Sequence, residues 1–193
     1  EVRNMIELDL QEVDAVAVAA GPGSFTGLRI GSATAKGLSF AMEKPVVAVP
    51  TVDGLAYNLY GTDKVVCPIM DARRSQVYTG IYEFLRDGEK YCLNIIKRQC
   101  AVALEEIAEA LNGLGGEVIL LGDGVPVCRG GMKESMRVAY TLAPAHMNRQ
   151  RAASIGALGS VYYAQGRFVS GEAFVPEYLR LSQAEREKCE GNH

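Results

Sequence analysis

A glycine-rich segment is the stretch of this sequence whose residue types are best suited to binding an anion. Gly21 and Gly23 are followed by Ser24, between a short apolar run and a long helical pattern. A glycine loop that opens a helix presents backbone N–H groups to a phosphate, helped by the helix dipole. The segment lacks the GxxxxGK(S/T) pattern of a Walker loop, and Thr26 occupies the third glycine position of the dinucleotide fingerprint. An isolated anion site at the helix start is therefore one interpretation.

A packing role is the second interpretation, because small residues recur at every fourth position. They are Gly23, Gly27, Gly31, Ala35 and Ser39. On a helix this spacing forms a slowly drifting stripe. Each interior glycine costs about 1 kcal/mol relative to alanine, so Gly27, Gly31 and Gly37 together cost about 3 kcal/mol. A close approach could offset that cost, made either by the protein's own sheet or by a helix of another chain.

Helical periodicity assigns other side chains of residues 24–42 to two faces. The predicted apolar ridge consists of Leu28, Gly31, Ala35, Leu38 and Met42. The predicted polar face consists of Arg29, Ser32 and Lys36. Under the docking interpretation, the ridge is the face that meets another chain.

Two further short patterns have both a binding and a structural interpretation. Asp71 followed by Arg73 and Arg74 could grip a phosphate or a partner carboxylate, or form a turn at a strand end. The sequence Gly122-Asp123-Gly124 could contact a nucleotide, or form a plain strand-to-loop turn. We expect Asp53 to act as a local cap or turn former.

The residue inventory offers no catalytic or metal-binding constellation. Ser24 has no nearby base, and His146 and His193 are the only histidines, so no triad can be assigned. The five cysteines include no pair at CxxC spacing, which indicates free thiols in a reducing cytoplasm and no zinc site. We expect no cofactor and no metal.

Charge and length narrow the class of protein further. The 193 residues carry 20 basic and 23 acidic side chains, a net charge of −3, without the basic excess of autonomous nucleic-acid binders. Contact with RNA inside a larger assembly stays open. No apolar run reaches the length of a membrane-spanning helix, so we expect no membrane association.

The elements that must position these residues alternate between strand and helix at the start, which predicts an α/β fold. An antiparallel meander follows. The predicted strands are 15–20, 46–49, 65–70, 76–84, 91–96 and 117–121, and the predicted helices are 24–42, a helix opening at Pro50-Thr51, 104–111 and 151–165. We expect a turn at Asp87-Gly88 and a loop over 125–135.

The first layer of this predicted fold is incomplete. Only two parallel strands precede residue 60, and a two-stranded sheet is marginal by itself. Further strands must come from a missing N-terminal segment, from the second half of the chain or from a partner. The first residue is Glu1 rather than methionine, which favours the missing segment.

One long motif is recognisable. The segment AAGPGSFTGLRIGSATAKGLSFA, residues 19–41, resembles the signature of the TsaB (YeaZ) family, the glycoprotease-like relatives of TsaD. The resemblance continues through Pro50-Thr51, Met70 to Arg74, Gln76 to Tyr78, Leu121 to Gly124 and Pro176 to Arg180.

The resemblance implies an actin/Hsp70/sugar-kinase fold with two RNase H-like lobes. Residues 1–60 would be the remainder of an N-terminal lobe, and residues 61–193 a C-terminal lobe with the meander and helices. It also implies a cytoplasmic, non-catalytic dimerisation subunit that activates TsaD, with TsaE completing a bacterial complex. That complex makes threonylcarbamoyladenosine beside the tRNA anticodon, so tRNA would be contacted only through it.

Carried over to this sequence, the family's pairing face comprises Phe25, Thr26, Gly27, Leu28, Arg29, Gly31, Ala35 and Lys36. A nucleotide or anion would contact Gly21, Gly23, Ser24, Asp71, Arg73, Gly122, Asp123 and Gly124. Two alternatives remain open. One is a homodimer through the same helix, and the other is a kinase-like ATPase or glycoprotease-type hydrolase using residues 21–27.

Overall fold

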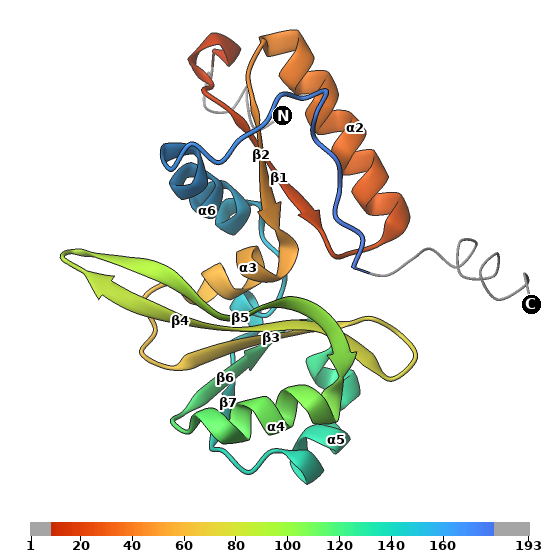
Figure 1. Cartoon of the computed structure of the whole chain (residues 1–193), viewed down its shortest axis with the longest axis vertical. Coiled ribbons are helices and arrows are strands. Elements are labelled where there is room, and N and C mark those ends of the chain that lie inside the picture. Colours follow the sequence, from red (N-terminus) through yellow and green to blue (C-terminus); the bar gives the residue numbers. More distant parts are fainter. Residues whose placement is uncertain (1–8, 180–193) are drawn as a thin grey trace, which may run out of the picture.

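The computed structural model describes residues 9–179 and contains two β-sheets (Figure 1). The first has two strands, and the second has five strands in the order β5-β4-β3-β6-β7. Predictions that concern Arg180, Cys189 and His193 lie outside the described residues. The α/β class predicted from the alternating pattern is confirmed.

The first sheet is a two-stranded parallel layer between two helices. Strands β1 (Val16–Gly21) and β2 (Val46–Pro50) pair in parallel. Helix α2 (Phe25–Met42) packs on one face, and α6 (Ala152–Ala164) packs on the other (Figure 1). Within residues 9–179, the second half adds to this sheet only an isolated antiparallel bridge between Val46 and Val169.

Helix α2 has the ends that its sequence predicts. The Ser24 side chain caps its start and accepts a hydrogen bond from the Gly27 N–H at 3.3 Å. Its end is closed by Glu43, which adopts a left-handed conformation with φ of 54°.

The second sheet contains the predicted meander, with longer strands than expected. Its strands are β3 (Val65–Asp71), β4 (Gln76–Asp87), β5 (Lys90–Ala103), β6 (Val118–Leu121) and β7 (Tyr140–Leu142). The β3–β4 and β4–β5 pairs are antiparallel, and β6 pairs in parallel with both β3 and β7. Gly88, at φ of +60°, lies in the predicted β4–β5 turn.

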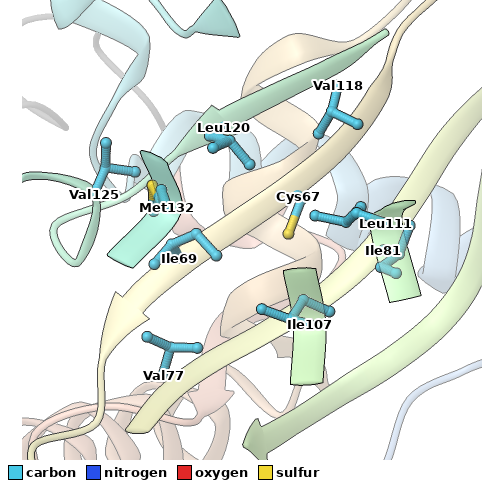
Figure 2. Packing of buried hydrophobic residues seen from close by; sticks show 10 residues of the cluster. All are labelled: Cys67, Ile69, Val77, Ile81, Ile107, Leu111, Val118, Leu120, Val125 and Met132. Carbon is cyan, nitrogen blue, oxygen red and sulfur yellow. The ribbon is translucent and has the colours of Figure 1, made fainter. Parts of the chain in front are cut away.

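The side of the second sheet that is turned away from the first sheet carries the largest hydrophobic cluster of the described residues (Figure 1). Helix α4 (Leu104–Leu114) and helix α5 (Val125–Ser135) pack beside it, and α4 runs past the predicted end at residue 111 to a C-cap at Gly115. Figure 2 shows the buried cluster between these elements, formed by Cys67, Ile69, Val77, Ile81, Ile107, Leu111, Val118, Leu120, Val125 and Met132. Burial raises the pKa of the Cys67 thiol to about 12, so this thiol stays protonated at neutral pH.

The predicted loop over 125–135 is wrong, because these residues form α5. Pro126 lies in the first turn, where the missing N–H is not needed. Gly130 and Gly131 weaken the helical pattern, but Val125 and Met132, two turns apart, are both buried. Tertiary burial therefore overrides the weak local propensity.

The two sheets meet at the short buried helix α3 (Thr51–Ala56). It continues into the 3₁₀ helix η2 (Tyr57–Leu59), and the other 3₁₀ helices are η1 (Leu10–Glu12) and η3 (Ala145–Met147). After η3 the chain returns to the first sheet, where α6 packs on β1 and β2. The division into lobes at residue 61 stays a prediction, and α6, which it assigns to the C-terminal lobe, packs on the strands of the first sheet.

A buried carboxylate connects the two layers. Asp53, on α3, accepts hydrogen bonds from the hydroxyl of Tyr82 on β4 at 2.7 Å and from that of Tyr162 on α6 at 3.2 Å. The Arg167 guanidinium lies 3.5 Å from the centre of the Tyr162 ring. The predicted role of Asp53 as a local cap is therefore wrong, because its partners come from distant parts of the chain.

Burial raises the pKa of Asp53 above its ordinary 3.8, while the two tyrosine hydrogen bonds and Arg167 act in the opposite direction. Tyr82 is itself buried, and burial beside Asp53 raises its pKa, so it remains a donor. The network thus keeps two hydroxyl donors on one carboxylate.

Replacing Tyr82 with phenylalanine should destabilise the fold. The change removes one donor from a buried carboxylate, and such a loss costs about 1–3 kcal/mol. Chemical denaturation would measure the free energy of unfolding, with Tyr78→Phe on the same strand as the control, because Tyr78 is half-buried and outside this network. An equal effect of the two changes would contradict a specific role for the Tyr82 hydroxyl.

Replacing Asp53 with asparagine should change how stability depends on pH. The raised pKa means that the stabilising contribution of the protonated carboxyl is complete below pH 3.8 and is lost as the pH rises through the raised value. The free energy of unfolding of Asp53→Asn, relative to wild type, should therefore increase with pH across that window. Denaturation between about pH 4 and about pH 7 tests this, and a constant difference would refute it.

Candidate functional site

Helix α2 buries small side chains and exposes large ones. The buried residues of this helix are Ser32, Ala35 and Ser39, which face the first sheet. Ile30, on the opposite side, is 63% exposed, and Phe40, which follows Ser39 toward the Lys36 edge, is 88% exposed. We define the outer face of α2 by its exposed uncharged residues, which are Phe25, Thr26, Gly27, Ile30, Ala33, Thr34, Gly37, Leu38, Phe40 and Ala41.

The charges of this helix are confined to one edge. Arg29 and Lys36 are the only charged residues among the 18 of α2. They are seven residues apart, so the helical repeat places them on nearly the same line, two turns from each other. No carboxylate among residues 9–179 pairs with Arg29 or Lys36 within 4.0 Å.

Packing within this chain does not require the α2 glycines. A Cβ atom added to Gly31 or Gly37 would meet nothing within 4 Å, and one added to Gly27 would meet only Ser24. By contrast, a Cβ on Gly159 of α6 would lie 2.6 Å from the Ala17 Cβ, so close approach to the sheet explains that glycine. Of the predicted small-residue stripe, Ala35 and Ser39 alone are buried against the first sheet.

The structure corrects the two predicted faces. Ala35 is buried while Leu38 is exposed, so the predicted ridge does not lie on one side. Ser32 is buried and does not join Arg29 and Lys36 in solvent. Among the predicted pairing residues, Phe25, Thr26, Gly27 and Arg29 are exposed, Leu28, Gly31 and Lys36 are half-buried, and Ala35 is inaccessible. The periodicity missed Ile30, which stands opposite the serines, and Phe40, which is 88% exposed.

A cleft between the two layers collects part of the predicted anion set. It has a volume of about 590 Å³, and its lining includes Gly23, Ser24, Asp71, Arg73 and Asp123. In the sequence, Asp123 is 52 residues from Asp71 and 100 residues from Gly23, yet all three line this cleft. The sequence order alone does not reveal this proximity. The lining does not include the other three predicted residues, Gly21, Gly122 and Gly124.

Those three glycines have structural reasons to be glycine. Gly21, at φ of +119°, has the Glu177 carbonyl where a Cβ would stand. Gly122, at φ of +120°, is equally close to the Ile69 carbonyl, and a Cβ on Gly124 would lie 3.0 Å from the same oxygen. Close backbone approach accounts for all three.

One side of the cleft is formed by a turn that the Asp71 carboxylate stabilises. The Asp71 side chain accepts a hydrogen bond from the Arg73 N–H at 2.7 Å, as in a turn at a strand end. Arg73, Arg74 and Ser75 all have positive φ angles, between 52° and 63°. The Arg73 guanidinium lies 3.7 Å from Asp71, so these charges are directed at each other within the loop.

Catalytic and metal-binding groups do not converge in the described part of the chain. Among residues 9–179, no three His, Cys, Asp or Glu side chains are placed to hold a metal ion. The Ser24 hydroxyl caps α2, and His146 is exposed on η3, outside the lining of the cleft. The four cysteines in this range are free thiols. Over the same range, every helix is too short or too polar to cross a bilayer.

Comparisons with known proteins agree over almost the whole chain. A family model described as TsaD, tRNA N6-adenosine threonylcarbamoyltransferase, matches residues 1–188. The tRNA threonylcarbamoyladenosine biosynthesis protein TsaB of Bacillus subtilis is 31% identical over 182 residues, covering 94% of this chain and 76% of the relative. The TsaB protein of Escherichia coli is 32% identical over 181 residues, covering 91% and 74%.

Solved structures give the same result. A Pseudomonas aeruginosa protein with similarity to peptidase YeaZ superposes with a TM-score of 0.75 at 29% identity, covering 93% of this chain and 79% of that one. YeaZ from Pseudomonas aeruginosa superposes with a TM-score of 0.73 at 29% identity, covering 92% and 78%. The resemblance carried by residues 19–41 is confirmed, and the chain belongs to the TsaB (YeaZ) family.

Proposed function

We propose that this chain is a non-catalytic subunit of the machinery that makes threonylcarbamoyladenosine in tRNA, and that it docks on TsaD through the outer face of α2. The observation that carries the proposal is the exposed apolar side of this helix, with Ile30 and Phe40 in solvent and no atom within 4 Å of a Cβ added to Gly37. The curated relatives are named as proteins of this biosynthesis.

The outer face has the composition of a protein interface. Contiguous exposed apolar surface marks an interaction site, and aromatic residues are enriched in the cores of such sites. Phe25 and Phe40 stand at the two ends of α2, with Ile30 and Leu38 between them. The glycines between these large side chains leave depressions in the surface, because they have no side chain. A partner helix can therefore approach the α2 backbone closely.

The relation between this chain and TsaD supports the choice of partner. Because the TsaD family model matches residues 1–188, a TsaD protein is expected to share this fold and to present an equivalent helix. Two equivalent helices pairing face to face resemble the isologous interface of a symmetric dimer. A homodimer through the same face is the competing outcome. We include in the proposal an actin/Hsp70/sugar-kinase type of fold, with TsaE and tRNA joining through the complex.

A scaffolding role accounts for the site better than catalysis does. The cleft holds Asp71 and Asp123, but the nearby hydroxyl of Ser24 serves as a helix cap and no histidine lines the cleft. A serine nucleophile needs a base within hydrogen-bond reach. The net charge of −3 also agrees with tRNA contact through partners rather than by this chain alone.

Changing Gly37, on the outer face of α2, to leucine should weaken binding to TsaD while preserving the fold. The new side chain meets no atom of this chain within 4 Å of its Cβ, but it overpacks a closely approaching partner, at about 1–3 kcal/mol or about 5-fold to 150-fold in Kd. Calorimetric titration with purified TsaD would measure this. Gly130→Leu on α5 is the matched control, because its Cβ also meets nothing within 4 Å. Equal affinity of Gly37→Leu and wild type would refute the proposed face.

The enzyme alternative makes the opposite prediction for the isolated chain. We expect no ATP turnover with magnesium, and we expect threonylcarbamoyladenosine formation by TsaD to increase when this chain is added. Both can be measured with purified proteins and a tRNA substrate. Turnover of ATP by this chain alone would favour a kinase-like ATPase.

A further inference from the structure

The segment after α6 lies alongside α2 for most of the helix (Figure 1). We call residues 171–179 the C-terminal strap. Its start meets the end of the helix, where Gly171 packs on Ser39 and the Glu172 carbonyl accepts a hydrogen bond from the Lys36 ammonium at 3.3 Å. Its end reaches the helix start, where the Tyr178 ring packs on Phe25 with 5.4 Å between the ring centres. The strap therefore follows the edge of α2 that carries Lys36.

Backbone and core contacts fix the strap in place. Phe174 is buried in a cluster with Ala20 and Val46. The Glu177 N–H donates to the Ala20 carbonyl at 2.7 Å, and Gly21 leaves room for the Glu177 carbonyl. The Glu177 carboxylate also accepts a hydrogen bond from the Gln99 amide of β5 at 2.9 Å. The strap is thus anchored to both layers. Its backbone is fixed, so its exposed side chains have defined positions on the surface.

Those exposed side chains extend the outer face of α2. Val175 is 71% exposed, and Tyr178 is exposed beside Phe25. The Arg29 guanidinium lies 4.2 Å from the centre of the Phe25 ring, so Arg29 and Tyr178 both contact Phe25. Tyr and Arg are the residue types that most often dominate binding energy. The contacts with Arg29 and Tyr178 restrict the Phe25 ring before binding, which lowers the entropy lost when a partner covers it.

We infer that the C-terminal strap is part of the docking surface, and that a TsaD helix lying on the outer face of α2 also contacts Tyr178 and Val175. This inference rests on the proposed function. The surface fits a helix with an uncharged central stripe and a carboxylate on the flank that faces Arg29. The positive edge disfavours a basic partner, and continuity with the apolar outer face favours a protein helix over a nucleic acid.

Two pairs of matched variants test the strap, with affinity for purified TsaD as the readout. Val175→Asp places a charge in the contact and should weaken binding about tenfold. Val127→Asp on α5 is its control, because Val127 is also 71% exposed. Tyr178→Ala removes the ring that packs on Phe25 and should weaken binding to a similar extent. Tyr178→Phe keeps this ring and should retain most of the affinity.

Tyr163→Ala is the control for the aromatic change, since Tyr163 packs on Phe168 at a similar 5.3 Å. Wild-type affinity in both Val175→Asp and Tyr178→Ala would overturn the strap inference while leaving the α2 proposal standing. If the wild-type chain itself does not bind TsaD, the proposed function fails and the strap inference fails with it. Val175→Asp decides the test should Tyr178→Ala not fold, because the Val175 side chain is largely free of the rest of the protein.

Discussion

The distribution of side chains around α2 is the constraint on which the account depends. A surface helix normally turns its large apolar residues inward, and burying one such side chain stabilises a protein by about 1.5–3 kcal/mol. In α2 the inward positions hold Ser32, Ala35 and Ser39, while Ile30 and Phe40 face outward. The small inward residues let the helix lie close to a two-stranded sheet. The outward residues gain burial only when a second surface covers them.

The rest of the fold holds this helix in a fixed position. The first sheet places α2 on one face, and α6 covers the other face. Asp53 then connects α6 to β4 through the hydroxyls of Tyr162 and Tyr82, so the first layer is tied to the second. The C-terminal strap makes a second tie, through Glu177 and Gln99. These polar contacts position an apolar surface for another chain.

Local patterns predicted the elements well, and tertiary contacts explain what they missed. The apolar run before Gly21 and the long helical pattern after it were enough to predict β1 and α2. Helix α5 was not predicted because Pro126, Gly130 and Gly131 have low helix propensity, although Val125 and Met132 are buried at helical spacing. The inward side of α2 was assigned wrongly because the side chains that face the first sheet, Ser32, Ala35 and Ser39, are small, and two of them are polar. The partners of Asp53 are 29 and 109 residues away, beyond the reach of any local rule.

Hydrogen–deuterium exchange on this chain, alone and with TsaD, tests the central claim most directly. A covered surface exchanges its amide protons more slowly, and mass spectrometry assigns the change to segments. The account predicts slower exchange over α2 and residues 171–179 when TsaD is present, with no change over α4 and α5. Protection confined to α4 and α5, with α2 exchanging as in the isolated chain, would contradict it.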